Sequence, residues 1–219
     1  MLFIVIFLQH SNYNHHPFNL NFIKMKKFVA VIAALFATMG AAQAQMAPVE
    51  ASPLRFMAGL GASFGGDNLA TAVYTNGNKQ DIKAGSGVYF TAGTNYRVNP
   101  AFSLQASINF HVDDTHANNG NIKFQRFPIE LLAYYHFNEQ FRLGGGVRYV
   151  SSAKLSSGGV AAGLDVEFDN TTSGVVEGEY FFTPQIGMKL RYVKESFKAA
   201  RVRGDIKADH VGISANYYF

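Results

Sequence analysis

The 219-residue sequence contains no cysteine. This absence excludes disulfide bonds and sites built on a thiolate. The sequence also has almost no net charge after its first 44 residues, which we expect to be removed. That stretch holds three of the 19 Lys and Arg residues and none of the 15 Asp and Glu residues, so the remaining 175 residues carry 16 basic and 15 acidic side chains. A nearly neutral chain of one-domain length lacks the positive charge typical of proteins that bind nucleic acid.

Three elements near the N-terminus follow the order of a secretory signal peptide. Met25-Lys26-Lys27 is basic, Phe28 to Met39 is apolar, and Ala42-Gln43-Ala44 supplies the small residues of a cleavage site before Gln45. The competing interpretations are a buried N-terminal helix and a genuine N-terminal extension. The expected division is a mis-called upstream extension over 1–24, a signal peptide over 25–44, a periplasmic lead over 45–52 and one domain over 53–219.

Long apolar runs are the third absence. After the expected cleavage no run of 18 or more apolar residues remains, so no helix of the mature chain would span a bilayer. If the protein is integral to a membrane, it has to be a closed barrel, because lipid offers no partner for unpaired backbone groups.

Apolar residues instead alternate with polar or small ones, the pattern of strands with one apolar face. The last strand shows it best, with Val211, Ile213, Ala215, Tyr217 and Phe219 on one face. Eight such segments occur, at 54–64, 84–98, 101–112, 122–137, 141–150, 172–182, 186–193 and 210–219. Short turns at 99–100, 138–140 and 183–185 alternate with longer polar connections at 65–83, 113–121, 151–171 and 194–208. We therefore predict an all-β fold, an eight-stranded antiparallel up-and-down transmembrane β-barrel with short periplasmic turns and longer extracellular loops.

The apolar faces of three predicted strands also have the same length, measured along the strand between aromatic residues. Aromatic residues recur eight positions apart, which is roughly 26 Å along a strand. On tilted strands this spacing covers most of an apolar band about 25 Å tall, with aromatic side chains at both edges. The alternative is the core of an ordinary β-sandwich. The pairs are Phe56 and Phe64, Phe102 and Phe110, and Phe141 and Tyr149.

The polar faces carry acids and bases that the short turns bring opposite each other. A tight turn fixes the register of the two strands that it joins. The predicted pairs inside the barrel are Glu130 with Arg148, His136 with Arg142, Glu177 with Arg191 and Glu179 with Lys189. Eight strands leave an interior that side chains fill, so these charges have to pair. The structural interpretation is a polar plug, and the functional one is a gated ion path or proton relay.

These features resemble the small eight-stranded outer-membrane proteins, namely the OmpA barrel domain, OmpX and the porin-like outer-membrane β-barrel family. The resemblance covers residues 53–219 and includes the segments PIELLAYYHF and FRLGGGVRYV and the aromatic ending at Tyr217 and Phe219. It implies a location in the bacterial outer membrane, recognition of Tyr217 and Phe219 by the barrel-assembly machinery, and contact with outer-membrane lipids and lipopolysaccharide. Members serve as structural anchors, adhesins or small pores, and we expect a monomer.

The last outer connection is basic and suits phosphate groups, which lie at that level in lipopolysaccharide. We expect it to contact lipopolysaccharide or another anionic polymer. The residues concerned are Lys194, Lys198, Arg201, Arg203 and Lys207.

Enzymatic chemistry has little support in the sequence. His210 and Ser214 share the inward face but lie about 13 Å apart along the strand, too far for a catalytic hydrogen bond. His111, Asp113, Asp114 and His116 could bind a divalent cation, although a solvated polar loop is the simpler interpretation. We expect no cofactor, no metal and no enzyme.

The predicted role is structural or interactive, through the extracellular loops. Three alternatives remain: a narrow ion or small-solute channel through the charged lumen, a lipid A-modifying enzyme, and a soluble lipocalin-like carrier. The carrier would place its apolar face inside, so the direction in which Glu130 points separates it from a membrane barrel.

Overall fold

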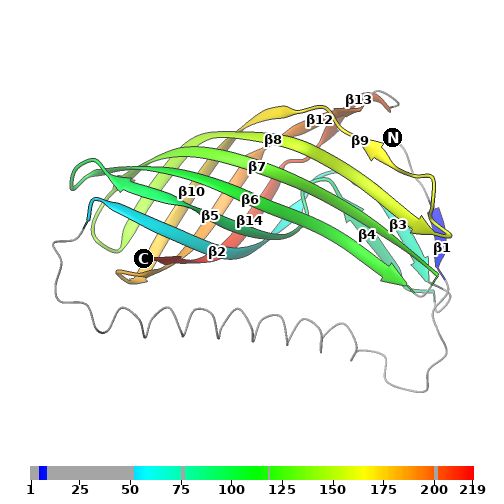
Figure 1. The fold of residues 1–219 in the computed structure, drawn as a ribbon, viewed down its shortest axis with the longest axis horizontal. Coiled ribbons are helices and arrows are strands. Elements are labelled where there is room, and N and C mark those ends of the chain that lie inside the picture. Colours follow the sequence, from blue (N-terminus) through cyan, green and yellow to red (C-terminus); the bar gives the residue numbers. More distant parts are fainter. Residues whose placement is uncertain (1–4, 9–51, 75–76, 118, 200–201) are drawn as a thin grey trace, which may run out of the picture. The chain divides into compact units, whose positions relative to one another are not determined.

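The computed structural model describes residues 5–8, 52–74, 77–117, 119–199 and 202–219 (Figure 1). The predicted signal peptide lies outside the described residues, as do most of the upstream extension and of the periplasmic lead. Among the described residues, no helix is long and apolar enough to cross a membrane.

Eight antiparallel strands close into a barrel. Each pairs with its two neighbours, and pairing of β14 with β2 closes the cycle. The prediction of an eight-stranded antiparallel barrel is confirmed. The strands, in their order around the barrel, are β2 (Leu54–Gly65), β5 (Gly87–Arg97), β6 (Phe102–Ala117), β7 (Gly120–His136), β8 (Phe141–Gly159), β10 (Thr171–Thr183), β11 (Ile186–Lys194) and β14 (His210–Tyr218).

The apolar face of the barrel points outward. On β7, Glu130 is 2% exposed, whereas its neighbours Ile129 and Leu131 are 53% and 56% exposed. A lipocalin-like carrier requires the opposite arrangement and is excluded. The expected aromatic edges also face outward, with Phe56 and Phe64 both exposed on β2.

The three short turns share one hydrogen-bonding device. Asn99 Oδ1 accepts from the backbone N–H groups two and three residues ahead, each over 2.9 Å. Asn138 Oδ1 does the same over 2.9 and 2.7 Å, and Thr183 Oγ1 over 3.3 and 3.1 Å. Asn and Thr side chains that bond the following backbone in this way favour tight turns.

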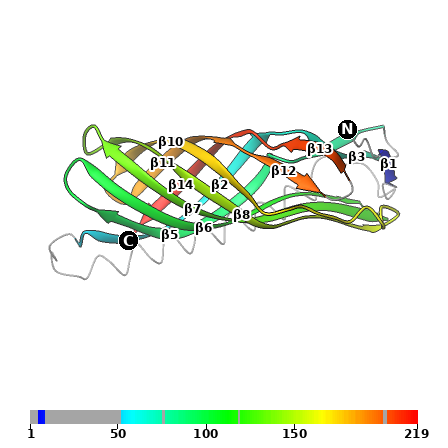
Figure 2. The same cartoon turned by 90° about the horizontal axis from the view of Figure 1, so that it is seen from above.

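At the opposite end the strands run well past the apolar band. The 16 residues of β6 span about 53 Å, which exceeds an apolar band about 25 Å tall even with a tilt of about 40°. The connections predicted as polar loops are thus largely strand. We call this region, the outer ends of β6, β7 and β8 with the short strands beside them, the outer extension (Figures 1 and 2). Its short strands are β3 (Asn68–Tyr74), β4 (Lys79–Lys83), β9 (Val166–Glu167), β12 (Ser196–Ala199) and β13 (Val202–Lys207). In addition, β1 (Val5–Leu8) pairs in parallel with β3.

The outer extension has an apolar core of its own. Phe124 of β7, Phe168 and Phe197 of β12 form a buried aromatic triad with ring centroids 5.4 to 6.0 Å apart. Leu155 and Ile82 belong to the same cluster. The interior of the unit therefore changes from polar at the level of the apolar band to apolar beyond it.

A β-bulge lies on β8 at the level of this change. Gln125 pairs with Lys154 and Phe127 with Ser151, so β8 carries one extra residue at this point. Ser152 adopts a positive φ of 55° there. A one-residue shift exchanges the two faces of a strand, and Ala153 and Leu155 therefore point into the core beyond the bulge.

Candidate functional site

The lumen contains acids and bases in the register that the turns predict. Glu130 lies opposite Arg148 across β7 and β8. The turn after β10 places Glu177 opposite Arg191 and Glu179 opposite Lys189. His136 likewise pairs with Arg142.

Ion pairs link these residues, apart from His136, into one continuous chain, which we call the charge ladder. It begins at the outer extension, where Arg126 lies 3.2 Å from Glu195. Glu195 accepts from Arg148 over 3.1 Å, and Arg148 donates to Glu130 over 2.6 Å. The second oxygen of Glu130 accepts from Arg191 over 2.7 Å.

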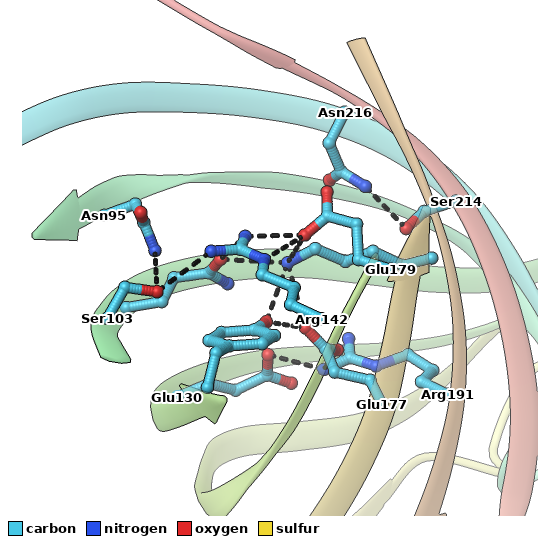
Figure 3. Close-up of polar contacts among 12 residues, drawn as sticks. Asn95, Ser103, Glu130, Arg142, Glu177, Glu179, Arg191, Ser214 and Asn216 are labelled. Carbon is cyan, nitrogen blue, oxygen red and sulfur yellow. Dashed lines mark hydrogen bonds and ion pairs between the residues drawn. The ribbon is translucent and has the colours of Figure 1, made fainter. Parts of the chain in front are cut away.

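The ladder continues toward the periplasmic turns (Figure 3). Arg191 lies 3.0 Å from Glu177, which in turn accepts from Lys189 over 2.9 Å. Lys189 lies 3.7 Å from Glu179, and Glu179 accepts from Arg142 over 2.5 Å. In the described part of the chain, five bases and four acids thus alternate, and each acid lies between two bases.

Every member of the charge ladder is buried. Removing an ion from water costs several kcal/mol, and that cost is offset only where its partners have good geometry. Neutral side chains complete the geometry here. Gln105 accepts from Lys189 over 2.9 Å, Tyr218 donates to Glu179 over 2.8 Å, and Tyr134 donates to Glu177. The arrangement fills the lumen with side chains whose opposite charges lie next to one another.

Two inward glycines make room for the aromatic members of the lumen. A Cβ at Gly144 would lie 2.4 Å from the Tyr134 ring, and a Cβ at Gly61 would lie 2.4 Å from the Tyr89 ring. Larger residues at these positions would displace the rings, so the glycines preserve the packing around the charge ladder.

Sequence reasoning missed three partners in the charge ladder. Arg142 lies opposite Glu179 across β8 and β10, but the long connection between those strands does not reveal their register. Arg126 lies in the predicted strand 122–137, but no partner was assigned to it, and Glu195 lies in the connection 194–208 that was predicted as a loop. The sequence signal that could have placed them is the alternation of inward and outward residues. It continues along β7 and β11 past the apolar band, where the inward positions remain buried.

A serine and a histidine do meet in the lumen. Ser63 Oγ lies 2.8 Å from His111 Nε2, and it also donates to the Gly85 carbonyl over 2.7 Å. Arg126 Nη2 lies 3.2 Å from both imidazole nitrogens. Because the single hydroxyl proton of Ser63 goes to the Gly85 carbonyl, His111 Nε2 is the donor in the bond to Ser63 and carries the imidazole proton. An imidazole in that tautomer does not activate a serine. The residues considered from sequence, His210 and Ser214, bond elsewhere: His210 Nδ1 to the Ala208 carbonyl, and Ser214 to Asn216.

The cluster considered as a cation site is part of β6 rather than a loop. His111 points into the lumen, while Asp114 is exposed on the outward face. Asp113 Oδ2 accepts from the Lys83 backbone N–H over 3.1 Å, and burial raises the pKa of this carboxyl above its ordinary value. Among the described residues, no three acidic, histidine or cysteine side chains converge as metal ligands do.

Four of the five basic residues of the last outer connection lie on β11, β12 and β13. Lys194 and Lys198 continue the outward face that Tyr192 occupies in the apolar band. Lys207 pairs with Ser196, which lies between those two lysines on the same exposed face. Arg201 lies outside the described residues, and for Arg203 the structure describes the backbone alone.

The last residues extend the closing strand. Tyr217 pairs with Ile186 on β11 and with Ala58 on β2. Its ring contacts that of Phe219 edge to face, with centroids 5.0 Å apart. The backbone N–H of Phe219 donates to the Phe56 carbonyl over 2.9 Å.

Comparison with known proteins identifies the family. Among solved structures, Ail, the attachment invasion locus protein of Yersinia pestis in complex with sucrose octasulfate, shares 14% identity over 76% of this chain and 97% of its own, with a TM-score of 0.48. Neisserial surface protein A shares 14% over 77% and 98%, and OprG from Pseudomonas aeruginosa 16% over 77% and 96%, both with a TM-score of 0.47. No curated protein sequence matches the chain. The family model of the outer membrane protein beta-barrel domain matches residues 31–219. Since that match covers most of the sequence, the chain belongs to the outer membrane protein beta-barrel domain family.

Proposed function

We propose that the protein is a structural component of the outer membrane that interacts through its outer extension. The observation that carries this proposal is the apolar core around Phe124, Phe168 and Phe197, which supports an ordered surface beyond the membrane. A buried core of this kind stabilises the connections that would otherwise be mobile loops. The charge ladder supports the structural part of the proposal, because its side chains occupy the lumen.

The contact that we propose is with the phosphate groups of lipopolysaccharide. Lys194, Lys198 and Lys207 surround Ser196 on an exposed face directly beyond Tyr192. Lys194 and Lys198 lie about 13 Å apart along the chain. Lipid headgroups lie beyond the apolar band, and clustered ammonium groups attract phosphate.

Binding of purified lipopolysaccharide to the refolded barrel tests this contact. The variant replaces Lys194, Lys198 and Lys207 with Gln and should bind several-fold more weakly. A control variant replaces Lys79, Lys123 and Lys154, which lie elsewhere on the outer extension, and changes the net charge equally. Equal affinity of the two variants would argue against a specific contact.

A narrow channel is the alternative, with the charge ladder as its gate. Planar-bilayer conductance separates the two functions. The structural proposal expects no discrete conductance steps from the wild type or from Glu130→Gln. Steps in the wild type that change in size with Glu130→Gln would favour the channel. A lipid A-modifying enzyme receives no support from the Ser63 and His111 geometry, and mass spectrometry of lipid A with and without the protein tests it.

Assembly through the C-terminal strand is a further proposal. Tyr217 and Phe219 lie on the closing strand, so recognition of this strand would precede closure of the barrel. Phe219→Ala should slow membrane insertion in cells and leave the stability of the refolded barrel nearly unchanged. Loss of stability without slower insertion would point to a purely structural role.

A further inference from the structure

The charge ladder carries one more positive than negative charge, because its five bases alternate with four acids. Its outer half contains Arg126, Arg148 and Arg191 with the carboxylates of Glu195 and Glu130. Its inner half contains two bases and two acids, of which Glu177 is shared with Arg191. A surplus charge buried in a lumen is strongly unfavourable unless it is compensated.

Unused hydrogen-bond donors occur in the same half. Arg126 Nε, Arg148 Nη2 and Arg191 Nε are buried and have no hydrogen-bond partner in the described part of the chain. Arg142 in the inner half, by contrast, donates through Nε, Nη1 and Nη2. The surplus charge belongs to the charge ladder as a whole, and the unused donors place it in the outer half.

The three arginines belong to a closed ring of side chains. On one side, Glu195, Arg148 and Glu130 link Arg126 to Arg191 through the ion pairs described above.

On the other side, two aromatic residues close the ring. The Arg191 guanidinium lies 5.7 Å from the centre of the Tyr89 ring, and the Tyr89 and His111 rings lie 5.3 Å apart. Arg126 Nη2 lies 3.2 Å from the His111 nitrogens. The members of this ring come from β5, β6, β7, β8 and β11, and Glu195 follows directly after β11.

We propose that a small monovalent anion of the halide type, such as chloride, binds inside this ring. It would accept hydrogen bonds from the unused guanidinium donors and neutralise the surplus charge. Water would satisfy the donors but would leave the charge. Of the carboxylates outside the ring, Glu177 lies 3.0 Å from Arg191 and is shared with Lys189, whereas Asp113 is half-buried and bonds the Lys83 backbone.

Anomalous diffraction tests the site directly. Crystals of the refolded wild-type barrel are grown in sodium bromide, and data are collected at the bromine absorption edge. The proposal expects an anomalous peak inside the ring, within hydrogen-bonding distance of at least two of the three arginines. A ring that contains water only, or bromide at other places only, would overturn it.

Halide-dependent stability provides a second test in solution. Anions that bind the folded state alone raise its stability by mass action. The urea midpoint of the wild type should be higher in sodium chloride or bromide than in sodium gluconate at equal ionic strength.

Two matched variants separate the ring from the rest of the charge ladder. Arg126→Gln and Arg142→Gln each remove one positive charge, but only Arg126 belongs to the outer half. The halide dependence should disappear in Arg126→Gln and persist in Arg142→Gln. Equal dependence in both, or none in the wild type, would contradict the proposal. If Arg126→Gln does not refold, the bromide map of the wild type still decides.

Discussion

Glu130 and Arg148 lie directly opposite each other on β7 and β8, and Arg148 Nη1 donates to Glu130 Oε1 over 2.6 Å. Both side chains are buried, so neither charge is stabilised by solvent. The other carboxylate oxygen of Glu130 accepts from Arg191 over 2.7 Å. One acid therefore separates two bases near the middle of the charge ladder.

Replacing Glu130 with Gln should destabilise the barrel by about 3–5 kcal/mol, because two buried guanidinium groups lose their shared carboxylate. Urea unfolding of the refolded protein, followed by its heat-modifiable gel migration, measures the loss. The control is Glu167→Gln, since Glu167 forms an exposed pair with Lys154 over 3.2 Å. An exposed pair contributes at most about 1 kcal/mol. Similar losses in the two variants would contradict a buried charge network.

Replacing Phe124 with Ala should weaken the outer extension while the barrel remains intact. The substitution leaves a cavity in the aromatic triad and should cost about 3–5 kcal/mol in that region. Limited proteolysis should then cut the outer extension, whereas the gel migration of the barrel should stay unchanged. Phe137→Ala serves as control, because Phe137 faces outward at the other end of β7. Proteolysis that affects both variants alike would argue against a separate outer core.

Asp113 gives the outer extension a predictable pH response. Burial raises the pKa of its carboxyl in the folded state, although Lys83 and Arg126 nearby act in the opposite direction. The folded state therefore binds this proton more tightly than the unfolded state, and the contribution to stability falls as pH rises through the interval between the two pKa values. Asp113→Asn should remove this dependence and stabilise the outer extension at neutral pH. Proteolysis rates at pH 4 to 7 measure the effect, and a steeper pH dependence in Asp113→Asn would contradict it.

The orientation of the barrel can be tested with single cysteines, because the chain has none that would compete. Val160→Cys, in the outer extension, should react in intact cells with a maleimide that cannot cross the membrane. Glu139→Cys, in a short turn, should react only after the outer membrane is permeabilised. Both positions are exposed, so accessibility within the protein does not limit either reaction. The reverse labelling pattern would invert the proposed topology.

The barrel itself could be predicted because residues close together in the sequence determine which face of each strand points outward and how strands joined by short turns pair. Alternation along each strand identifies the outward face, and a tight turn fixes the register of the strands that it joins. Glu130 and Arg148 were therefore paired correctly from positions on either side of one turn. The direction of Ile129 follows from the same alternation.

The outer extension and part of the charge ladder could not be predicted in this way. Arg142 and Glu179 are opposite each other only because β8 pairs with β10 across a long connection, which leaves the register open in the sequence. Arg191 meets Glu130 through the lumen rather than across neighbouring strands. Beyond Val150 the alternation of β8 breaks at the bulge, and a broken pattern resembles a loop.

Ser152 is the extra residue of the bulge on β8, and it shifts the inward positions of the strand by one residue. Upstream of it arginine and glycine point inward, and downstream of it alanine and leucine point inward. Deleting this residue would place Ala153 two positions after Val150, so strict alternation would keep Val150, Ala153 and Leu155 on the inward face without a bulge. The extra residue therefore changes the path and twist of β8 where the charged interior meets the apolar core, and it leaves the set of inward side chains the same.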